Sequence, residues 1–146
     1  MLRSSHLIIL GNGPSLKDYD FPNYKSCDTL GMNAAYRYWD KINWYPNHYI
    51  CLDDQVIDTH ASEILRLIKD GIIKSFFLSS VILERYPEIK EYPNVFFLQS
   101  FVTKWEVLAI EQGLPVIESD YFISEKPNFI TTGGHAIRFA AFIIRE

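Results

Sequence analysis

A glycine-rich segment near the start of the chain has the composition of a phosphate-binding loop. It follows a short apolar run at residues 6–10 and consists of Gly11, Asn12, Gly13, Pro14 and Ser15. Glycines let a ligand approach the backbone closely, and N–H groups at the start of the following helical turn favour an anion. Pro14 suits the first position of that turn, and Asn12 or Ser15 supplies an oxygen to cap it. A plain turn between a strand and a helix is the alternative interpretation.

The residues after this loop exclude two common phosphate-binding motifs. Leu16 stands where a dinucleotide-binding loop has its third glycine, and no Lys-Ser or Lys-Thr pair follows as in a Walker A loop. NAD chemistry and Walker-type ATP hydrolysis are therefore disfavoured.

Polar residues also follow the second and third apolar runs of the chain. Asn33 comes after residues 27–32, and Asp53 and Asp54 come after residues 47–52. If these runs are parallel strands, their carboxyl ends meet at one edge, so we expect the first loop, Asn33 and Asp53 to converge on one crevice. The acidic pair is either a magnesium site beside a diphosphate or a cap on the following helix, and both interpretations remain open.

The histidines and cysteines give no metal-binding pattern. The four histidines, His6, His48, His60 and His135, lack metal-ligand spacing. His135 is a weak catalytic candidate because it follows a second glycine-rich turn, whose residues are Thr131, Thr132, Gly133 and Gly134. The two cysteines form no CxxC pair, which predicts reduced thiols and a cytoplasmic protein without a bound metal.

Alternating apolar segments predict the fold class. Strands are expected at residues 6–10, 27–32, 47–52, 72–78 and 94–98, with helices at 33–39, 56–69, 81–86 and 133–145. Pro87 should end the third helix, residues 101–112 are amphipathic, and 114–126 form a loop. This order predicts an α/β, Rossmann-like single domain over residues 1–146, with a mostly parallel sheet and helices on both faces.

Composition and charge limit the partners. The 146 residues carry a net charge of −4 with scattered Lys and Arg, so nucleic acid is not an expected partner. No apolar run approaches the roughly 20 residues of a membrane span, and the first residues lack a secretory signal.

Four short motifs in order resemble those of a known enzyme family. They are residues 6–16, Gly31-Met32-Asn33, Tyr49 to Asp53, and Phe129 to Gly134 followed by an alanine-rich helix. Together they resemble bacterial sialyltransferases of the Campylobacter type, and the related domain of motility-associated glycosyltransferases and of an archaeal pterin pyrophosphokinase. The resemblance implies a GT-A-like variant of the Rossmann-like fold and a role in cell-surface polysaccharide synthesis.

The resemblance also implies a donor, an acceptor and residue roles. The donor would be a CMP-activated sialic acid or related keto-sugar acid, transferred to a glycan acceptor without an obligatory cofactor. The first loop and Asn33 would lie near the donor phosphate and ribose, Asp53 near the sugar, and Thr132, Gly133 and Gly134 near the nucleotide. Phe129 departs from the family, which usually has a basic residue there, and Asp53 stands where the family has Asn.

In this family a further strand and a histidine-bearing lid follow the last helix, whereas this sequence ends at Glu146. We therefore expect a domain that lacks these elements, binds a cytidine nucleotide, has no assigned general base beyond the weak candidates Asp53 and His135, and transfers little sugar. Self-association, and peripheral membrane association of the full-length protein, are further expectations. The alternatives are a pterin pyrophosphokinase-like transferase that uses ATP and magnesium, and a non-catalytic nucleotide-binding fragment.

Overall fold

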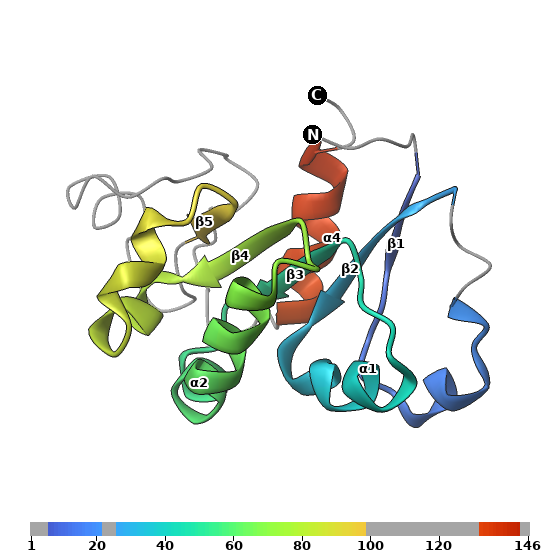
Figure 1. Ribbon diagram of the computed structural model, residues 1–146. Helices are drawn as coiled ribbons and strands as arrows, with labels where there is room; N and C mark the ends of the chain where they lie inside the picture. Colours follow the sequence, from blue (N-terminus) through green and yellow to red (C-terminus); the bar gives the residue numbers. More distant parts are fainter. Residues whose placement is uncertain (1–5, 22–25, 99–131, 144–146) are drawn as a thin grey trace.

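The computed structural model describes residues 6–21, 26–98 and 132–143, which form an α/β fold around one parallel sheet (Figure 1). Every neighbouring pair of strands is parallel, and the order in the sheet is β1-β2-β3-β4-β5. The strands are β1 (Leu7–Ile9), β2 (Asp28–Met32), β3 (His48–Cys51), β4 (Ser75–Ser79) and β5 (Val95–Leu98). The predicted Rossmann-like α/β class is confirmed, and all five predicted strands are present.

Helices cover both faces of the sheet, as the continuous apolar strands predict. One face packs against α1 (Tyr36–Ile42), α2 (Asp54–Asp70) and the short 3-10 helices η4 (Ser80–Glu84) and η5 (Pro87–Glu91). The opposite face packs against α4 (Thr132–Ile143), where Ala136 is buried with Met32 and Leu52. Figure 1 shows α4 behind the sheet, with its first turn toward the carboxyl ends of the strands.

The longest helix, α2, begins and ends at residues that the sequence favours for those positions. Asp53 precedes the helix and caps its first turn, and Gly71 follows it with φ 68°. A positive φ of this kind costs glycine little, which makes it a common residue after a helix. The observed helix therefore begins two residues before the predicted 56–69 segment and ends one residue after it.

Strand β2 depends on a glycine near its carboxyl end. A Cβ atom on Gly31 would overlap the indole ring of Trp39 and lie 2.9 Å from Pro46 Cγ. Trp39 is only 1% exposed and packs edge-on against Tyr49, with ring centroids 6.0 Å apart. Gly31 is thus required by the close packing of α1 on the sheet.

Two local predictions differ from the structure in detail. The helix predicted at residues 33–39 is present, but it begins as a 3-10 turn, η3 (Asn33–Ala35), because Asn33 has φ 53° and cannot start an α-helix. Pro87 begins η5 instead of ending a helix, since its fixed φ suits a first helical position.

Some predictions fall outside the described residues, namely those for 101–112, 114–126 and Thr131. Within the described part of the chain, none of the helices has the length and apolar character that crossing a membrane requires.

Candidate functional site

The first loop leaves the sheet at the carboxyl end of β1. The Leu10 N–H donates to the Leu30 carbonyl at 2.8 Å, and the chain then turns to the surface, where Gly11 to Ser15 are all exposed. Gly13 precedes the five-residue 3-10 helix η1 (Pro14–Asp18), with Pro14 at its first position as predicted. The predicted side-chain cap from Asn12 or Ser15 is wrong, because no side chain caps η1. The Gly13 carbonyl instead accepts from the Leu16 N–H at 3.2 Å.

The fold itself does not require glycine in this loop. A Cβ on Gly11 would meet nothing within 4 Å, and a Cβ on Gly13 would make only an ordinary contact with Ser15 Oγ at 3.5 Å. The φ of Gly13 is −70°, which any residue adopts. Neither packing nor backbone strain explains these two glycines, and the close approach of a ligand remains as a physical reason for them.

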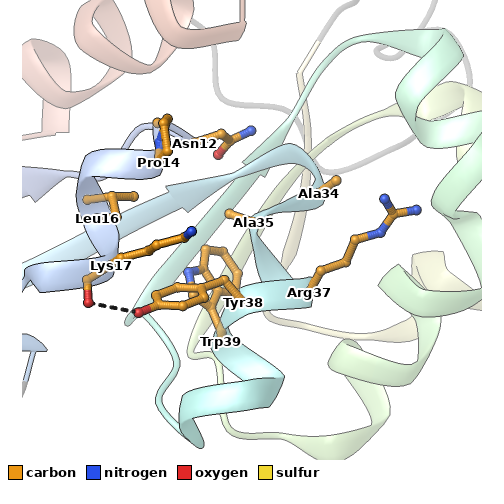
Figure 2. A pocket seen from close by; sticks show the side chains of 10 residues that line it. Asn12, Pro14, Leu16, Lys17, Ala34, Ala35, Arg37, Tyr38 and Trp39 are labelled. Atoms are coloured by element: carbon orange, nitrogen blue, oxygen red, sulfur yellow. Dashed lines mark hydrogen bonds between the residues drawn. The ribbon is translucent and has the colours of Figure 1, made fainter.

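A cavity of about 340 Å³ lies between this loop and the start of the next helix (Figure 2). Its walls come from two stretches of chain, one containing η1 and the other η3 and α1. The Tyr38 hydroxyl connects the two walls by donating to the Lys17 carbonyl at 3.2 Å. The lining residues are Asn12, Gly13, Pro14, Leu16, Lys17, Ala34, Ala35, Arg37, Tyr38 and Trp39.

The polar side chains of the described lining include an amide and two cations, besides the Tyr38 hydroxyl. Asn12, Lys17 and Arg37 line it, and none of the described lining residues is acidic. The remaining surface is formed by small, aliphatic and aromatic side chains, a combination typical of sites for organic ligands. The cavity therefore favours an anion that also has an apolar or flat portion.

Lys17 and Arg37 were not among the predicted site residues. Lys17 lies in η1, directly after the first loop, whereas Arg37 lies in α1, 20 positions further along the chain. The predicted loop residues Asn12, Gly13 and Pro14 do line the cavity, whereas Gly11, Ser15 and Asn33 do not.

Asn33 lies directly after β2 with an unusual backbone and an unsatisfied side chain. Its φ is 53°, a region that asparagine enters more easily than most residues, and its carbonyl accepts from the Tyr49 hydroxyl at 2.8 Å. Its Oδ1 atom is buried and has no hydrogen-bond partner in the described part of the chain. Such an atom costs about 1–3 kcal/mol if nothing satisfies it, so a water or a ligand group is expected there.

The start of α4 has a second atom of this kind. Thr132 is 4% exposed, and its Oγ1 lacks a hydrogen-bond partner within the ranges that the structure describes. Gly133 and Gly134 in the same turn are half-buried. Asn33 follows β2 directly and Thr132 begins α4, whose first turn lies toward the carboxyl ends of the strands (Figure 1). Both residues have a buried oxygen without a partner among the described residues. The described residues do not include Thr131 or the side chain of His135.

Both residues of the acidic pair accept hydrogen bonds within the fold. Asp53 Oδ1 accepts from the backbone N–H groups of Gln55 at 2.9 Å and Val56 at 3.2 Å, so it caps α2. Asp54 Oδ1 accepts from the Ser79 hydroxyl at 2.8 Å. The described residues contain no group of three or more His, Cys, Asp or Glu side chains arranged to hold a metal ion. Of the two interpretations of this pair, the geometry favours the helix cap.

The described histidines and cysteines lie apart from the cavity lining. His48 begins β3 and so lies at the amino ends of the strands, whereas the first loop lies at their carboxyl ends. Burial lowers the pKa of His48. His60 lies on α2, with Nδ1 2.7 Å from the Tyr36 hydroxyl, and partial burial and then Arg37 lower its pKa. Cys27 and Cys51 are both free, and burial raises the pKa of Cys51 to about 12, which makes its thiol unreactive near neutral pH.

Comparisons with protein-family models, curated protein sequences and solved structures found no significant match for this chain. The chemistry of the site is therefore inferred from three features at one edge of the parallel sheet. They are a glycine loop, a cationic cavity and two buried oxygens without a partner among the described residues.

Proposed function

We propose that this chain is the nucleotide-binding part of a glycosyltransferase that uses a CMP-activated sugar acid. The observation that carries the proposal is the cavity beside the first loop, where the charged residues among the described lining are Lys17 and Arg37. It lies where parallel α/β sheets bind ligands, beyond the carboxyl ends of the strands. The motifs that resemble the sialyltransferases supply the identity of the nucleotide and the sugar.

In the proposed complex the donor phosphate lies against the backbone of Gly11 to Gly13, which are exposed. The amide of Asn33 and the first turn of α4, with Thr132, Gly133 and Gly134, bind the nucleoside. Binding would satisfy the buried oxygens of Asn33 and Thr132, which have no described partner. Asp53 lies at the neighbouring strand end, and one of its carboxylate oxygens is committed to the cap of α2.

The chemistry assigned to this site is displacement at the anomeric carbon. The acceptor hydroxyl attacks that carbon, the bond to the phosphate oxygen breaks, and its electron pair leaves with CMP. The cations and the N–H groups of the first loop stabilise the charge that develops on the phosphate. The acceptor proton goes to a general base or to water, and Asp53 and His135 remain weak candidates for that base.

A CMP donor has a single phosphate, so the proposal includes no obligatory cofactor. The partners are the donor and a glycan acceptor, and the two free cysteines suit work in the cytoplasm. Peripheral attachment to a membrane and self-association belong to the same proposal. A pyrophosphokinase-like transferase would require magnesium held by Asp53 and Asp54, and their hydrogen bonds to the backbone and to Ser79 leave that alternative without a specific observation in its favour.

The test is calorimetric titration with CMP and with ATP plus Mg²⁺. We expect CMP to bind and Asn33→Ala to weaken its binding. Asn43→Ala is the matched control, because Asn43 also has a positive φ of 49° but ends α1 away from the cavity lining. The two variants share the backbone cost of alanine in this conformation, so a loss of CMP binding that is confined to Asn33→Ala supports a ligand contact. Tighter binding of ATP plus Mg²⁺ than of CMP would overturn the proposal.

A further inference from the structure

The cavity beside the first loop concentrates positive charge in an acidic protein. The chain has 18 Asp and Glu against 14 Lys and Arg, for a net charge of −4. Both charged residues in the described lining of the cavity are nevertheless cations, Lys17 from η1 and Arg37 from α1. Since no described lining residue is acidic, the cavity favours anions over cations and neutral molecules.

Arg37 differs from the other arginines whose side chains the structure describes. Arg66 pairs with Asp40, Glu63 and Asp70, and Arg85 pairs with Asp58. Within the described residues neither Arg37 nor Lys17 forms an ion pair. Their charges are therefore available to a ligand instead of being neutralised within the fold.

The two cations belong to different walls of the cavity. Figure 2 shows the Lys17 side chain extending across the cavity above Tyr38 and Trp39, and the Arg37 side chain pointing away from Lys17. The hydrogen bond from the Tyr38 hydroxyl to the Lys17 carbonyl fixes the backbone of η1 against α1. Cations held on separate walls suit two separate anionic groups better than a single one.

The chemistry of the two side chains suggests which group each would take. Lysine is a compact point charge, and Lys17 comes shortly after the loop that is proposed to hold the phosphate. Arginine presents a planar fork that matches a carboxylate through two parallel hydrogen bonds. An activated sugar acid has both groups, a phosphodiester and a carboxylate, whereas the nucleotide of a neutral sugar lacks the carboxylate.

We propose that the cavity is a two-point anion site, in which Lys17 binds the donor phosphate and Arg37 binds the sugar carboxylate. This inference rests on the proposed function and deepens it, because it assigns the selection of an acidic sugar to Arg37, which is not part of the first loop. Asn12 contributes an uncharged amide to the same cavity.

The experiment is calorimetric titration of the parent, Lys17→Gln and Arg37→Gln with cytidine, CMP and CMP-N-acetylneuraminate. Lys41→Gln is the control, because Lys41 is an exposed cation on α1 that does not line the cavity. We expect Lys17→Gln to weaken both anionic ligands about three- to fivefold and to leave cytidine unchanged, as exposed charge pairs are screened. Arg37→Gln should weaken the sugar nucleotide by a similar factor and CMP by less than about twofold.

Equal losses for CMP and the sugar nucleotide in Arg37→Gln would overturn the two-point site. Unchanged affinities in both variants would also overturn it, and would leave the proposed function to the first loop and Asn33. If the parent binds no cytidine ligand, the proposed function fails, and inorganic pyrophosphate becomes the probe. Pyrophosphate binding that both variants weaken would still support two anion positions, and its absence would overturn them.

Discussion

Replacing Gly31 by alanine tests whether the packing of α1 on the sheet is as tight as the structure indicates. The new Cβ would overlap the six-membered part of the Trp39 ring and approach Pro46 Cγ to 2.9 Å. Trp39 has little room to withdraw, because it is 1% exposed and packs against Tyr49. The strand also has little room to move, because β2 is paired with β1 on one side and with β3 on the other.

The size of the effect follows from this geometry. Inserting a methyl group into a well-packed core usually costs about 1–3 kcal/mol, and an overlap with an aromatic ring that cannot move belongs at the upper end. We expect a loss of about 3 kcal/mol in the free energy of unfolding. In a domain of this size that corresponds to a fall of roughly 6–12 °C in Tm.

Thermal and urea unfolding of Gly31→Ala would measure the loss, and Gly11→Ala is the matched control because its Cβ would meet nothing within 4 Å. A second variant, Gly31→Ala with Trp39→Phe, removes the ring atoms that the new methyl group meets. The combined cost should then be smaller than the sum of the two single changes. A Gly31→Ala protein as stable as the parent, or strict additivity in the double variant, would refute the packing argument.

Three further changes test the site and its electrostatics. Gly13→Ala should leave Tm unchanged or raise it slightly, because φ is −70° and alanine reduces the entropy of the unfolded chain, yet it should weaken CMP binding in calorimetry; equal CMP affinity would remove this residue from the site. Asp53→Ala should cost about 0.5–2 kcal/mol in denaturant unfolding through loss of the α2 cap, whereas Asp53→Asn retains the cap, so a loss of CMP affinity in the asparagine variant would reveal a role for the carboxylate. Burial lowers the pKa of His48 below the value of about 6.5 expected in the unfolded chain, so the unfolded state binds more protons. Tm should therefore stay constant above about pH 7, and it should fall as the pH drops through about 6.5 toward the folded pKa. The neighbouring Asp28 carboxylate opposes this shift and Lys74 adds to it, and a pH profile that His48→Gln leaves unchanged would contradict the assignment.

The α/β fold and the positions of the strands could be predicted from local pattern alone. The sequence predicted the stop at Gly71, and it offered the cap at Asp53 as one of two interpretations. Each of these residues lies next to an end of the helix in the chain, and such signals do not depend on tertiary contacts. The need for a glycine at residue 31 could not be predicted, because it arises from Trp39, which reaches the strand only after α1 has packed.

The candidate site was predicted in part for the same reason. Loop residues such as Gly13 have a local signature, whereas the cavity exists only because η1 and α1 lie side by side. Lys17 and Arg37 are 20 positions apart, and nothing in their immediate neighbours indicates that they line one cavity. The unsatisfied oxygens of Asn33 and Thr132 are also properties of the packed chain, since hydrogen-bond partners cannot be counted from sequence.

The position of the first loop follows from how the helices are distributed over the sheet. Strands that follow one another in order with right-handed connections place their helices on one face, and α1 and α2 lie there. Helix α4 instead packs on the other face, where Ala136 is buried against β2 and β3. The loop after β1 thus lies at the carboxyl edge between helices of opposite faces, with the cationic cavity on the α1 side and Thr132 at the start of α4. A ligand bound to the backbone at Gly13 could therefore contact helices on both faces of the sheet. The glycines, the cations and the unsatisfied oxygens can form a single site only if one ligand reaches both sides in this way.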